Sequence, residues 1–595
     1  MTGPLRDPNV DESTIEKLDE AADELNELAE DLGLSPNSVN YWLVNHDEIN
    51  QLAAYDGFQT RYPHWKWGMK YVERKKKDAY FGGKIFELVN HDEPSSAFLQ
   101  ESNSLQEQKS VIAHVEAHAD FFANNKFFPD DPDAAAMLER HARIIESYYE
   151  DPSIEYEEVE EWIDAILCLE NTIDELSPME DVNNSNPDED NKGPSAREKV
   201  DSLDISEDVK RQVFGEIEDE EEEDMAEEET DVLAFLLKHG KQFNEESERA
   251  VEYEDWQRTI LEILRREAYY FAAQKMTKIM NEGWAAFWES VMMTNEGYAE
   301  ADEIIDYADK QSMVLNAPGL NPYKIGKELW EYIENRRNRR EVADKLLRVK
   351  GIDWRNYHND VDFTDVMEKL EENADDSVLC EKHYSLLRRQ NLGFLETIPQ
   401  DELQRIDRYM FEKDRYDTVE EALQDVDYEA GWKRMREIRE THNDITFIDA
   451  FLTEEFIDKE EYFAYEFNPQ NEQFEVSGVD LDSVKQKLLL QITNGGKPTI
   501  QASDKNYNNA GELLLKHQYN GIPLDMKQSE EVLKRVFNLW GRPVNLKTID
   551  KDAEGNEQGI ILRYDGESIE EEETDDVEDI RADQIDYDTK PEDWL

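Results

Sequence analysis

Cysteine is scarce in this sequence. The chain has 595 residues but only two cysteines, Cys168 and Cys380, which lie far apart and form no C-x-x-C pair. A disulfide-stabilised scaffold or a thiolate metal cluster needs more, and more closely spaced, cysteines, so both are excluded. A chain of this length can bury a large core and is expected to form several domains.

Positive charge is also scarce, because 65 Lys and Arg face 142 Asp and Glu, for a net charge of −77. A general nucleic-acid binder is excluded, since phosphate contacts need clustered Lys and Arg. Acidic runs occur at 216–230 and 567–588, yet carboxylates also line the polar faces of helices elsewhere. Such pervasive acidity is typical of salt-accumulating cells, where concentrated cation screens the repulsion. We therefore expect an intracellular halophilic protein that folds poorly at low salt.

Long apolar runs are absent. No stretch approaches eighteen uninterrupted apolar residues, and the sequence begins without an apolar run. We expect a soluble, cytoplasmic protein with no membrane insertion. Common catalytic templates are missing too, because the sequence has no G-x-S-x-G, no P-loop and no G-x-G-x-x-G motif.

Helical periodicity dominates what is present. Apolar residues recur three and four apart over 12–31, and helical patterns continue at 132–149, 158–175 and through most of 254–445. After about residue 450, stretches rich in β-branched and aromatic residues predict strands at 459–467, 474–479, 496–503 and 559–566. Helices are expected between them at 480–496 and 528–541. The fold class is therefore mainly α, with a small C-terminal α+β domain.

Composition suggests five segments. A large helical domain is expected in two parts, 1–176 and 231–450, separated by an acidic insertion at 177–230. The α+β domain follows at 451–566, and an acidic tail at 567–595 ends the chain. The insertion and the tail are predicted to be disordered, because they carry too few apolar residues to offset the entropy of ordering.

The stretch "VIAHVEAHADFFANN", residues 111–125, places His114 and His118 four residues apart on an otherwise apolar helix. Residues at this spacing have Cβ atoms roughly 6 Å apart, so both imidazoles can bind one metal ion. The alternative is a pair of buried neutral histidines that donate to backbone carbonyls. A metal site therefore requires a third ligand.

Glu282 is the best candidate for that ligand. It lies in "TKIMNEGWAAFW", a strongly apolar and aromatic stretch, where a buried carboxylate is costly unless it is paired or metal-bound. Gly283 beside it allows the backbone of a neighbouring element to approach closely. Glu289, seven residues on, lies on the same face, so this helix can present two carboxylates inward. Alternatively, one or both point to solvent or pair with arginine.

Three further residues are candidates with weaker support. Glu101, just upstream of the histidines, and Glu289 are candidate catalytic carboxylates. Glu101 is otherwise an ordinary solvated turn residue. His64 is a fourth possible ligand, but its neighbours Trp65 and Trp67 favour aromatic packing around a structural histidine.

The paired histidines and the later N-E-G-aromatic-A stretch are similar to the zinc ligands of gluzincin metallopeptidases. Those enzymes carry H-E-x-x-H, with a general-base glutamate directly after the first histidine. Val115 stands at that position here, and Glu116 lies about 200° round the helix from His114. The peptidase base is therefore missing, although zinc or another divalent transition metal fits the expected ligands.

Five stretches together resemble one family, the SpoVR (stage V sporulation protein R-like) proteins. They are "RYPHWKWG", "AHVEAHADFFANN", "TKIMNEGWAAFW", "LNPYKIGKELW" and residues 511–546. The resemblance implies a large helical N-terminal domain and a small C-terminal domain. It also implies a link to spore cortex formation in sporulating bacteria, and genes nearby for a serine protein kinase and a von Willebrand-type protein. Two positions depart from the family, because its members often have Gly at Ala117 and His at Glu289.

Two functions remain open. The first is a metal-binding protein, if an enzyme then a metal-dependent hydrolase, with His114, His118 and Glu282 as ligands. The second is a non-enzymatic regulatory or scaffold protein that acts with a serine protein kinase through its C-terminal domain and acidic segments.

Overall fold

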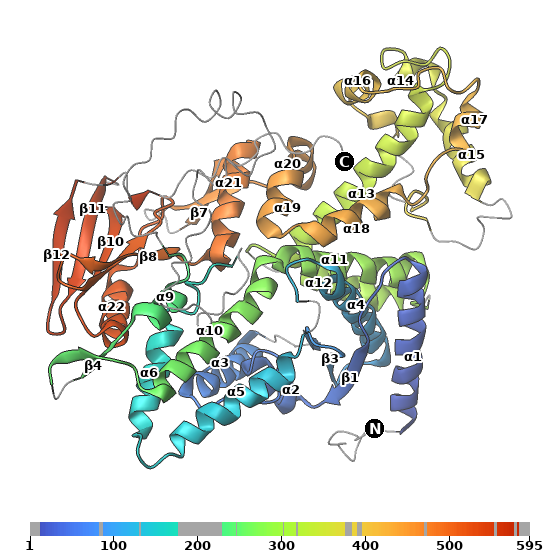
Figure 1. Ribbon diagram of the computed structural model, residues 1–595. Helices are drawn as coiled ribbons and strands as arrows, with labels where there is room; N and C mark the ends of the chain where they lie inside the picture. The colour runs from blue at the N-terminus through green and yellow to red at the C-terminus, as the bar shows by residue number, and fades with distance from the viewer. Residues whose placement is uncertain are drawn as a thin grey trace, which may run out of the picture. The chain divides into compact units, whose positions relative to one another are not determined.

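The computed structural model describes residues 12–81, 87–129, 132–175, 229–244, 247–300, 303–316, 319–374, 384–388, 395–468, 473–551, 556–575, 577 and 580–581 (Figure 1). The predicted acidic insertion at 177–230 lies outside the described residues, apart from Glu229 and Thr230. The end of the predicted tail, residues 582–595, also lies outside them.

The described residues form two compact units, each assembled from two separate stretches of chain. The first unit is built from residues within 1–146 and 273–496, and the second from residues within 147–272 and 497–585. The domain boundaries that the sequence suggested follow composition, and they stay predictions.

The first unit is mainly helical. Its helices are α1 (Glu12–Asp31), α2 (His46–Ala54), α3 (Trp65–Phe81), α4 (Leu105–Asn124), most of α5 (Ala134–Tyr149), α11 (Lys278–Ser290), α12 (Ile304–Leu315), α13 (Pro322–Leu347), α14 (Tyr357–Asp360), α15 (Phe363–Ala374), α16 (Gln400–Arg408), α17 (Val419–Leu423), α18 (Ala430–Thr441), α19 (Asp444–Phe451), α20 (Glu454–Glu460) and α21 (Leu481–Ile492). A π-helical turn, η2 (Val291–Asn295), follows α11, and short 3-10 turns occur at η3 (Leu395–Thr397) and η4 (Thr493–Gly496).

Two small sheets complete the first unit. Strands β1 (Val39–Val44), β2 (Glu87–Asn90) and β3 (Ser95–Gln100) pair in the order β1-β3-β2, with β1 parallel and β2 antiparallel to β3. Strands β6 (Ala464–Asn468) and β7 (Gln473–Gly478) form an antiparallel hairpin.

The second unit combines helices with the C-terminal sheet. Its helices are α6 (Tyr156–Leu167), α9 (Val232–His239), most of α10 (Asp255–Met276) and α22 (Met526–Trp540), and β4 (Gln242–Asn244) pairs with β5 (Arg249–Val251). The five-stranded sheet has the order β12-β11-β10-β9-β8, with bounds β8 (Ile500–Tyr507), β9 (Glu512–His517), β10 (Val544–Lys551), β11 (Glu557–Tyr564) and β12 (Ile569–Thr574). Only β9 and β10 are parallel, and α22 connects them.

The fold class predicted from the sequence, mainly α with a small C-terminal α+β part, is confirmed. The periodic stretch at 12–31 forms α1, and the four expected strands correspond to β6, β7, β8 and β11. Strands β9 and β10 were missed. Their residues are almost all buried, so their sequences lack the alternation that marks a half-exposed strand.

The predicted disorder of the tail is wrong for its first part. Ile569–Thr574 form β12, which pairs antiparallel with β11 at the edge of the sheet. An edge strand leaves its side chains accessible to solvent, so a run of glutamates can occupy it, and charge there also discourages pairing with other chains. Glu570 forms an ion pair with Arg563 on β11, with the Nη1 and Oε2 atoms 3.1 Å apart.

The closest helix crossing in the first unit brings α11 against α13. A Cβ atom added to Gly283 on α11 would lie 2.4 Å from the Cα of Gly326 on α13. Neither position can carry a side chain without separating the helices. The close approach that the sequence suggested for Gly283 is therefore confirmed. It fixes the point along α11 at which this helix crosses α13.

A buried ion pair ties α4 to α11 and α18. Asp120 on α4 accepts from Arg439 Nη1 at 2.6 Å and from Trp284 Nε1 at 2.9 Å. It also accepts from the backbone N–H of Ser35 at 2.8 Å. These contacts satisfy a fully buried carboxylate and hold α4 and α11 side by side.

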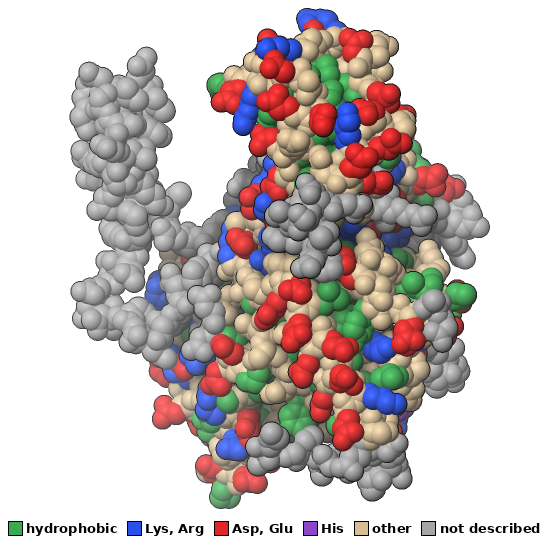
Figure 2. Space-filling view, turned by 90° about the vertical axis from the view of Figure 1, so that its right-hand side faces the viewer, with side chains coloured by type: hydrophobic (Ala, Val, Ile, Leu, Met, Phe, Trp, Pro, Cys, Tyr) green, Lys and Arg blue, Asp and Glu red, His purple; other side chains and the backbone are tan. Residues whose placement is uncertain are grey.

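Acidic side chains are spread over the face shown in Figure 2, among fewer basic ones, rather than gathered in one patch. This agrees with the carboxylates that the sequence carries on its helices outside the two acidic runs. Among the described residues, no helix combines the length and apolarity that a bilayer crossing requires.

Candidate metal centre

Helix α4 presents both histidines to the interior. Its first turn is fixed by a capping box, in which the Ser104 hydroxyl accepts from the Glu107 backbone and the Glu107 carboxylate accepts from the Ser104 backbone. One turn apart, the rings of His114 and His118 have centroids separated by 4.6 Å. Their side chains are only 8% and 5% exposed. Two buried imidazoles thus share one face of the helix.

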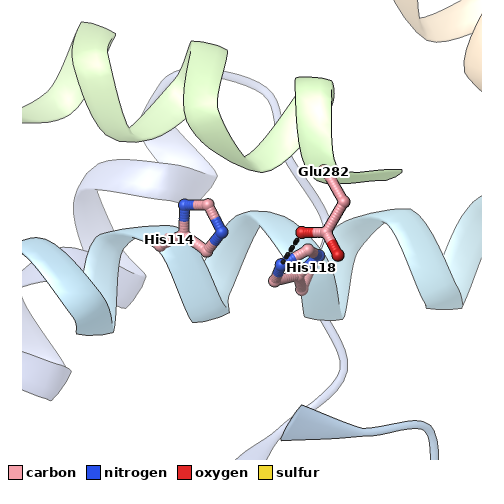
Figure 3. A group of neighbouring side chains, drawn as sticks. All are labelled: His114, His118 and Glu282. Carbon is pink, nitrogen blue, oxygen red and sulfur yellow. Dashed lines mark ion pairs between the residues drawn. The ribbon is translucent and has the colours of Figure 1, made fainter. Parts of the chain in front are cut away.

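Helix α11 brings Glu282 to the same place (Figure 3). Its Oε2 atom lies 3.5 Å from Nε2 of His118. Ligand atoms of His114, His118 and Glu282 all lie within 4.8 Å of one another. A tetrahedral ion with bonds near 2.05 Å separates its ligand atoms by about 3.3 Å, which is close to the separation of the His118 and Glu282 atoms. The three residues therefore form a group that could hold a metal ion.

Asn281 determines which nitrogen of His118 faces Glu282. Its Oδ1 atom lies 2.8 Å from Nδ1 of His118, on the other side of the ring from the Glu282 contact. A carboxamide oxygen can only accept, so Nδ1 carries the proton and the lone pair of a neutral ring lies on Nε2. Two consecutive residues of α11 thus hold the two nitrogens of one imidazole.

Glu289 contacts the Nδ1 atom of His114. Its Oε2 atom lies 2.9 Å from Nδ1 of His114. The other carboxylate oxygen accepts from Gln311 Nε2 at 2.7 Å and from the Ser110 hydroxyl. Glu289 is therefore a neighbour of the three-residue group rather than a member of it, and the catalytic role that the sequence suggested for it stays a prediction.

The charges around Glu282 favour its ionised form. Burial of the Glu282 carboxyl group raises its pKa, but the contact with His118, the charges that His118 and His114 carry when protonated, and the charge of Lys278 outweigh burial. The net effect is a pKa below the ordinary value. Glu282 is thus available as a carboxylate ligand at neutral pH.

Glu116 lies on the opposite side of α4. Its carboxylate accepts from the Tyr41 hydroxyl at 2.7 Å and from Asn26 Nδ2 at 2.9 Å, and its burial raises its pKa. It therefore anchors β1 and α1 and does not face the histidines. The sequence-based conclusion that the peptidase base is missing from this helix agrees with this placement.

The structure does not bring Glu101 or His64 into the group. Glu101 is exposed in the turn after β3, where its backbone N–H donates to Val44. His64 is buried before α3, and its ring lies 5.3 Å from that of Trp65 and 6.2 Å from that of Tyr62. His64 thus has the aromatic surroundings that its neighbours in sequence suggested, and a catalytic role for Glu101 stays a prediction.

Sequence reasoning missed four residues around the group. Asn281 immediately precedes Glu282, and helix geometry could have indicated it. Tyr323, in the "LNPYKIGKELW" stretch, stacks obliquely beside His114 with ring centroids 6.0 Å apart. Ser110 and Gln311 carry no signal in the sequence, because only the packing of α4 and α12 against α11 brings them to Glu289.

Comparison with known proteins finds two family models that together match residues 12–551. A family model described as "SpoVR like protein" matches residues 12–425 and 359–497. A second model, "SpoVR-like C-terminal domain", matches residues 498–551. The first match includes both histidines and Glu282.

A curated relative matches nearly end to end. It is "Uncharacterized protein YcgB" of Escherichia coli (strain K12), which is 23% identical over 568 residues, covering 91% of this chain and 93% of the relative. No solved structure matches the chain significantly.

Proposed function

This chain belongs to the SpoVR family, and we propose that it is a metal-binding protein in which His114, His118 and Glu282 bind a divalent transition metal. The observation that carries the proposal is the convergence of the three side chains from two helices, with ligand atoms within 4.8 Å of one another. The burial of the two histidines matters equally, because a partly enclosed site favours protein ligands over the hydration of the ion.

Zinc and iron are the ions that we expect. Imidazole and carboxylate ligands suit both, and two histidines with one carboxylate occur in hydrolytic zinc sites and in non-haem iron sites. The partners of the histidines support this proposal, because metal-binding histidines usually donate their second ring N–H to a carboxylate or carbonyl oxygen. Glu289 and Asn281 have this position here.

Metal-dependent hydrolysis is the chemistry that we propose for the occupied site. Three protein ligands leave a coordination position for water, as in catalytic rather than structural zinc sites. Because Glu116 faces β1 and α1, a peptidase-type base at this point of the helix is not part of the proposal. A bound ion would supply Lewis-acid chemistry that makes water a better nucleophile at neutral pH, and His114, His118 and Glu282 would hold that ion, so the proposal does not need a peptidase-type base.

We also propose that the protein works in the cytosol of a salt-accumulating cell, given its net charge of −77. The test of metal binding should therefore use protein purified in concentrated salt. Elemental analysis is expected to find about one zinc or iron per chain, and His114→Ala, His118→Ala and Glu282→Gln are each expected to reduce that content severalfold or more.

His64→Phe provides the matched control, because it removes a buried histidine outside the group and should retain the metal. Chelation should lower the thermal midpoint of the wild type but not of His114→Ala, since a ligand that binds only the folded state stabilises it. The proposal would be contradicted if wild-type protein stays metal-free after incubation with zinc and with iron, and if a chelator does not change its thermal midpoint.

A further inference from the structure

We infer that Glu289 is a positioning residue of this metal site, which orients His114 and strengthens it as a ligand through its negative charge. The inference rests on the proposed metal binding and adds to it a specific role for a residue outside the ligand group. It differs from the catalytic role that the sequence suggested for Glu289.

The geometry places Glu289 at the second nitrogen of His114. The Oε2 atom of Glu289 and Nδ1 of His114 are 2.9 Å apart, which is a charge-assisted hydrogen bond. With Nδ1 as the donor, the nitrogen that a metal would take is Nε2. Glu289 itself is 5% exposed, so the carboxylate acts on His114 with little solvent screening.

The two histidines are held by chemically different groups. His118 donates to the neutral carboxamide of Asn281, whereas His114 donates to an anionic carboxylate. A carboxylate partner draws the ring proton more strongly and makes the opposite nitrogen a better electron donor. His114 is thus expected to be the stronger of the two imidazole ligands, and the charge of Glu289 adds to that of Glu282 in attracting a divalent cation.

Helix α12 holds Glu289 in this position. Gln311 on α12 donates to Oε1 of Glu289 at 2.7 Å, and the Ser110 hydroxyl on α4 donates to the same oxygen. Two ion pairs fix α12 to α4. Lys310 on α12 lies 2.9 Å from Glu107 on α4, and Lys109 on α4 lies 3.6 Å from Glu303 at the start of α12. The carboxylate therefore has few orientations open to it besides the one facing His114.

The test compares metal affinity in Glu289→Gln and wild-type protein, with Co(II) as the spectroscopic probe and a chromophoric chelator as competitor. Gln keeps the shape and one acceptor oxygen but removes the charge. We expect a 10- to 100-fold weaker affinity with the stoichiometry unchanged, the size usual for loss of such a partner, and a changed Co(II) absorption spectrum. Gln311→Met should give a smaller loss, because it only loosens Glu289.

Glu334→Gln is the matched control. Glu334 is another buried carboxylate of the same unit, and it pairs with Arg388 at 2.7 Å rather than with a histidine. Its variant should lose stability while its Co(II) affinity and spectrum stay those of the wild type. This separates a general loss of stability from an effect on His114.

The outcomes distinguish the two proposals. If wild-type protein binds no Co(II), the proposed metal function fails. If wild type binds Co(II) and Glu289→Gln binds it within about twofold of that affinity and with the same spectrum, the positioning role is overturned while metal binding stands. If Glu289→Gln loses stoichiometric binding altogether, as His114→Ala should, Glu289 is a ligand and the positioning role is also overturned.

Discussion

Asp444 supplies the cap that the first turn of α11 otherwise lacks. Thr277, at the N-cap position of α11, makes no side-chain capping bond. Instead, the two carboxylate oxygens of Asp444, from α19, accept from the backbone N–H groups of Ile279 and Met280 at 2.8 and 2.9 Å. The helix that carries Glu282 is therefore anchored by a residue far away in the sequence.

The burial of Asp444 should make stability depend on pH. Burial raises its pKa, the two backbone hydrogen bonds and the charge of Lys278 lower it, and the charge of Glu282 raises it, with a net pKa of about 7. In the unfolded chain the group titrates near its ordinary value of 3.8. Between these two values the folded state holds a proton that the unfolded state has released, so its contribution to stability falls as pH rises through this window.

The free energy of unfolding of the wild type, measured in concentrated salt, should fall between about pH 4 and pH 7. We therefore predict that Asp444→Asn reduces this fall. Asn cannot ionise, although it loses one of the two capping oxygens and should be less stable than wild type at the acid end. Parallel pH profiles for the two proteins would refute the assignment.

A second aspartate, Asp480, provides the control, because folding lowers its pKa whereas folding raises that of Asp444. Asp480 caps the exposed start of α21, where its bonds with Ser483 lower its pKa. Its contribution to stability is present above the ordinary pKa and is lost as pH falls. Asp480→Asn should therefore leave the profile between pH 4 and 7 close to that of the wild type.

At the scale of elements, the crossing of α11 and α13 is the contact on which the geometry of the site depends. Gly283 and Gly326 let the two backbones touch, and Glu282 is the residue directly before Gly283. Any widening of this crossing moves Glu282 relative to α4. The fold and the ligand geometry are thus linked through one pair of glycines.

Gly283→Ala is predicted to destabilise the protein by about 1 to 3 kcal/mol, the usual cost of overpacking, and to weaken metal affinity. The methyl group would lie 2.3 Å from the carbonyl carbon of Gly326, so the helices must separate. Denaturant unfolding in concentrated salt and the Co(II) competition assay measure the two effects.

Gly68 is the control for this substitution, because replacing it with alanine is expected to stabilise the protein rather than destabilise it. It lies exposed within α3, and a Cβ atom there meets nothing within 4 Å. Gly68→Ala should stabilise the helix by up to about 1 kcal/mol, because alanine has less backbone entropy to lose. Equal effects of the two substitutions would show that the crossing does not control the site.

At the scale of the whole molecule, the excess of carboxylates should make folding depend on salt. With a net charge of −77, repulsion between like charges opposes the compact state, and salt shortens its range from about 10 Å at 0.1 M to about 3 Å at 1 M. We predict that the thermal midpoint rises steeply with KCl over this range and beyond.

Sucrose is the control for the salt prediction, because it stabilises proteins without screening charge. At a concentration that stabilises an ordinary protein, it should not restore folding in low salt. A thermal midpoint that is independent of KCl would contradict both the screening argument and the proposed halophilic origin.

Local chemistry determined much of this protein from the sequence alone. Helix α1 follows from apolar residues spaced three and four apart, because that spacing defines a buried stripe. The adjacency of His114 and His118 follows in the same way, since one helical turn separates them. The carboxylate of Glu282 and the close approach at Gly283 were predictable from an apolar segment that tolerates neither a lone charge nor a larger residue.

Only the tertiary structure decided how the ligands are paired and supported. Glu282 and Glu289 lie on one face of α11, about 10 Å apart along its axis. The sequence favoured Glu282 as the ligand but did not indicate which side chain Glu289 contacts. The packing of α11 against α4 brings Glu282 to Nε2 of His118 and Glu289 to Nδ1 of His114. The partners Ser110, Gln311 and Asp444 come from separate elements, because contacts between elements depend on helix crossings that no local pattern encodes.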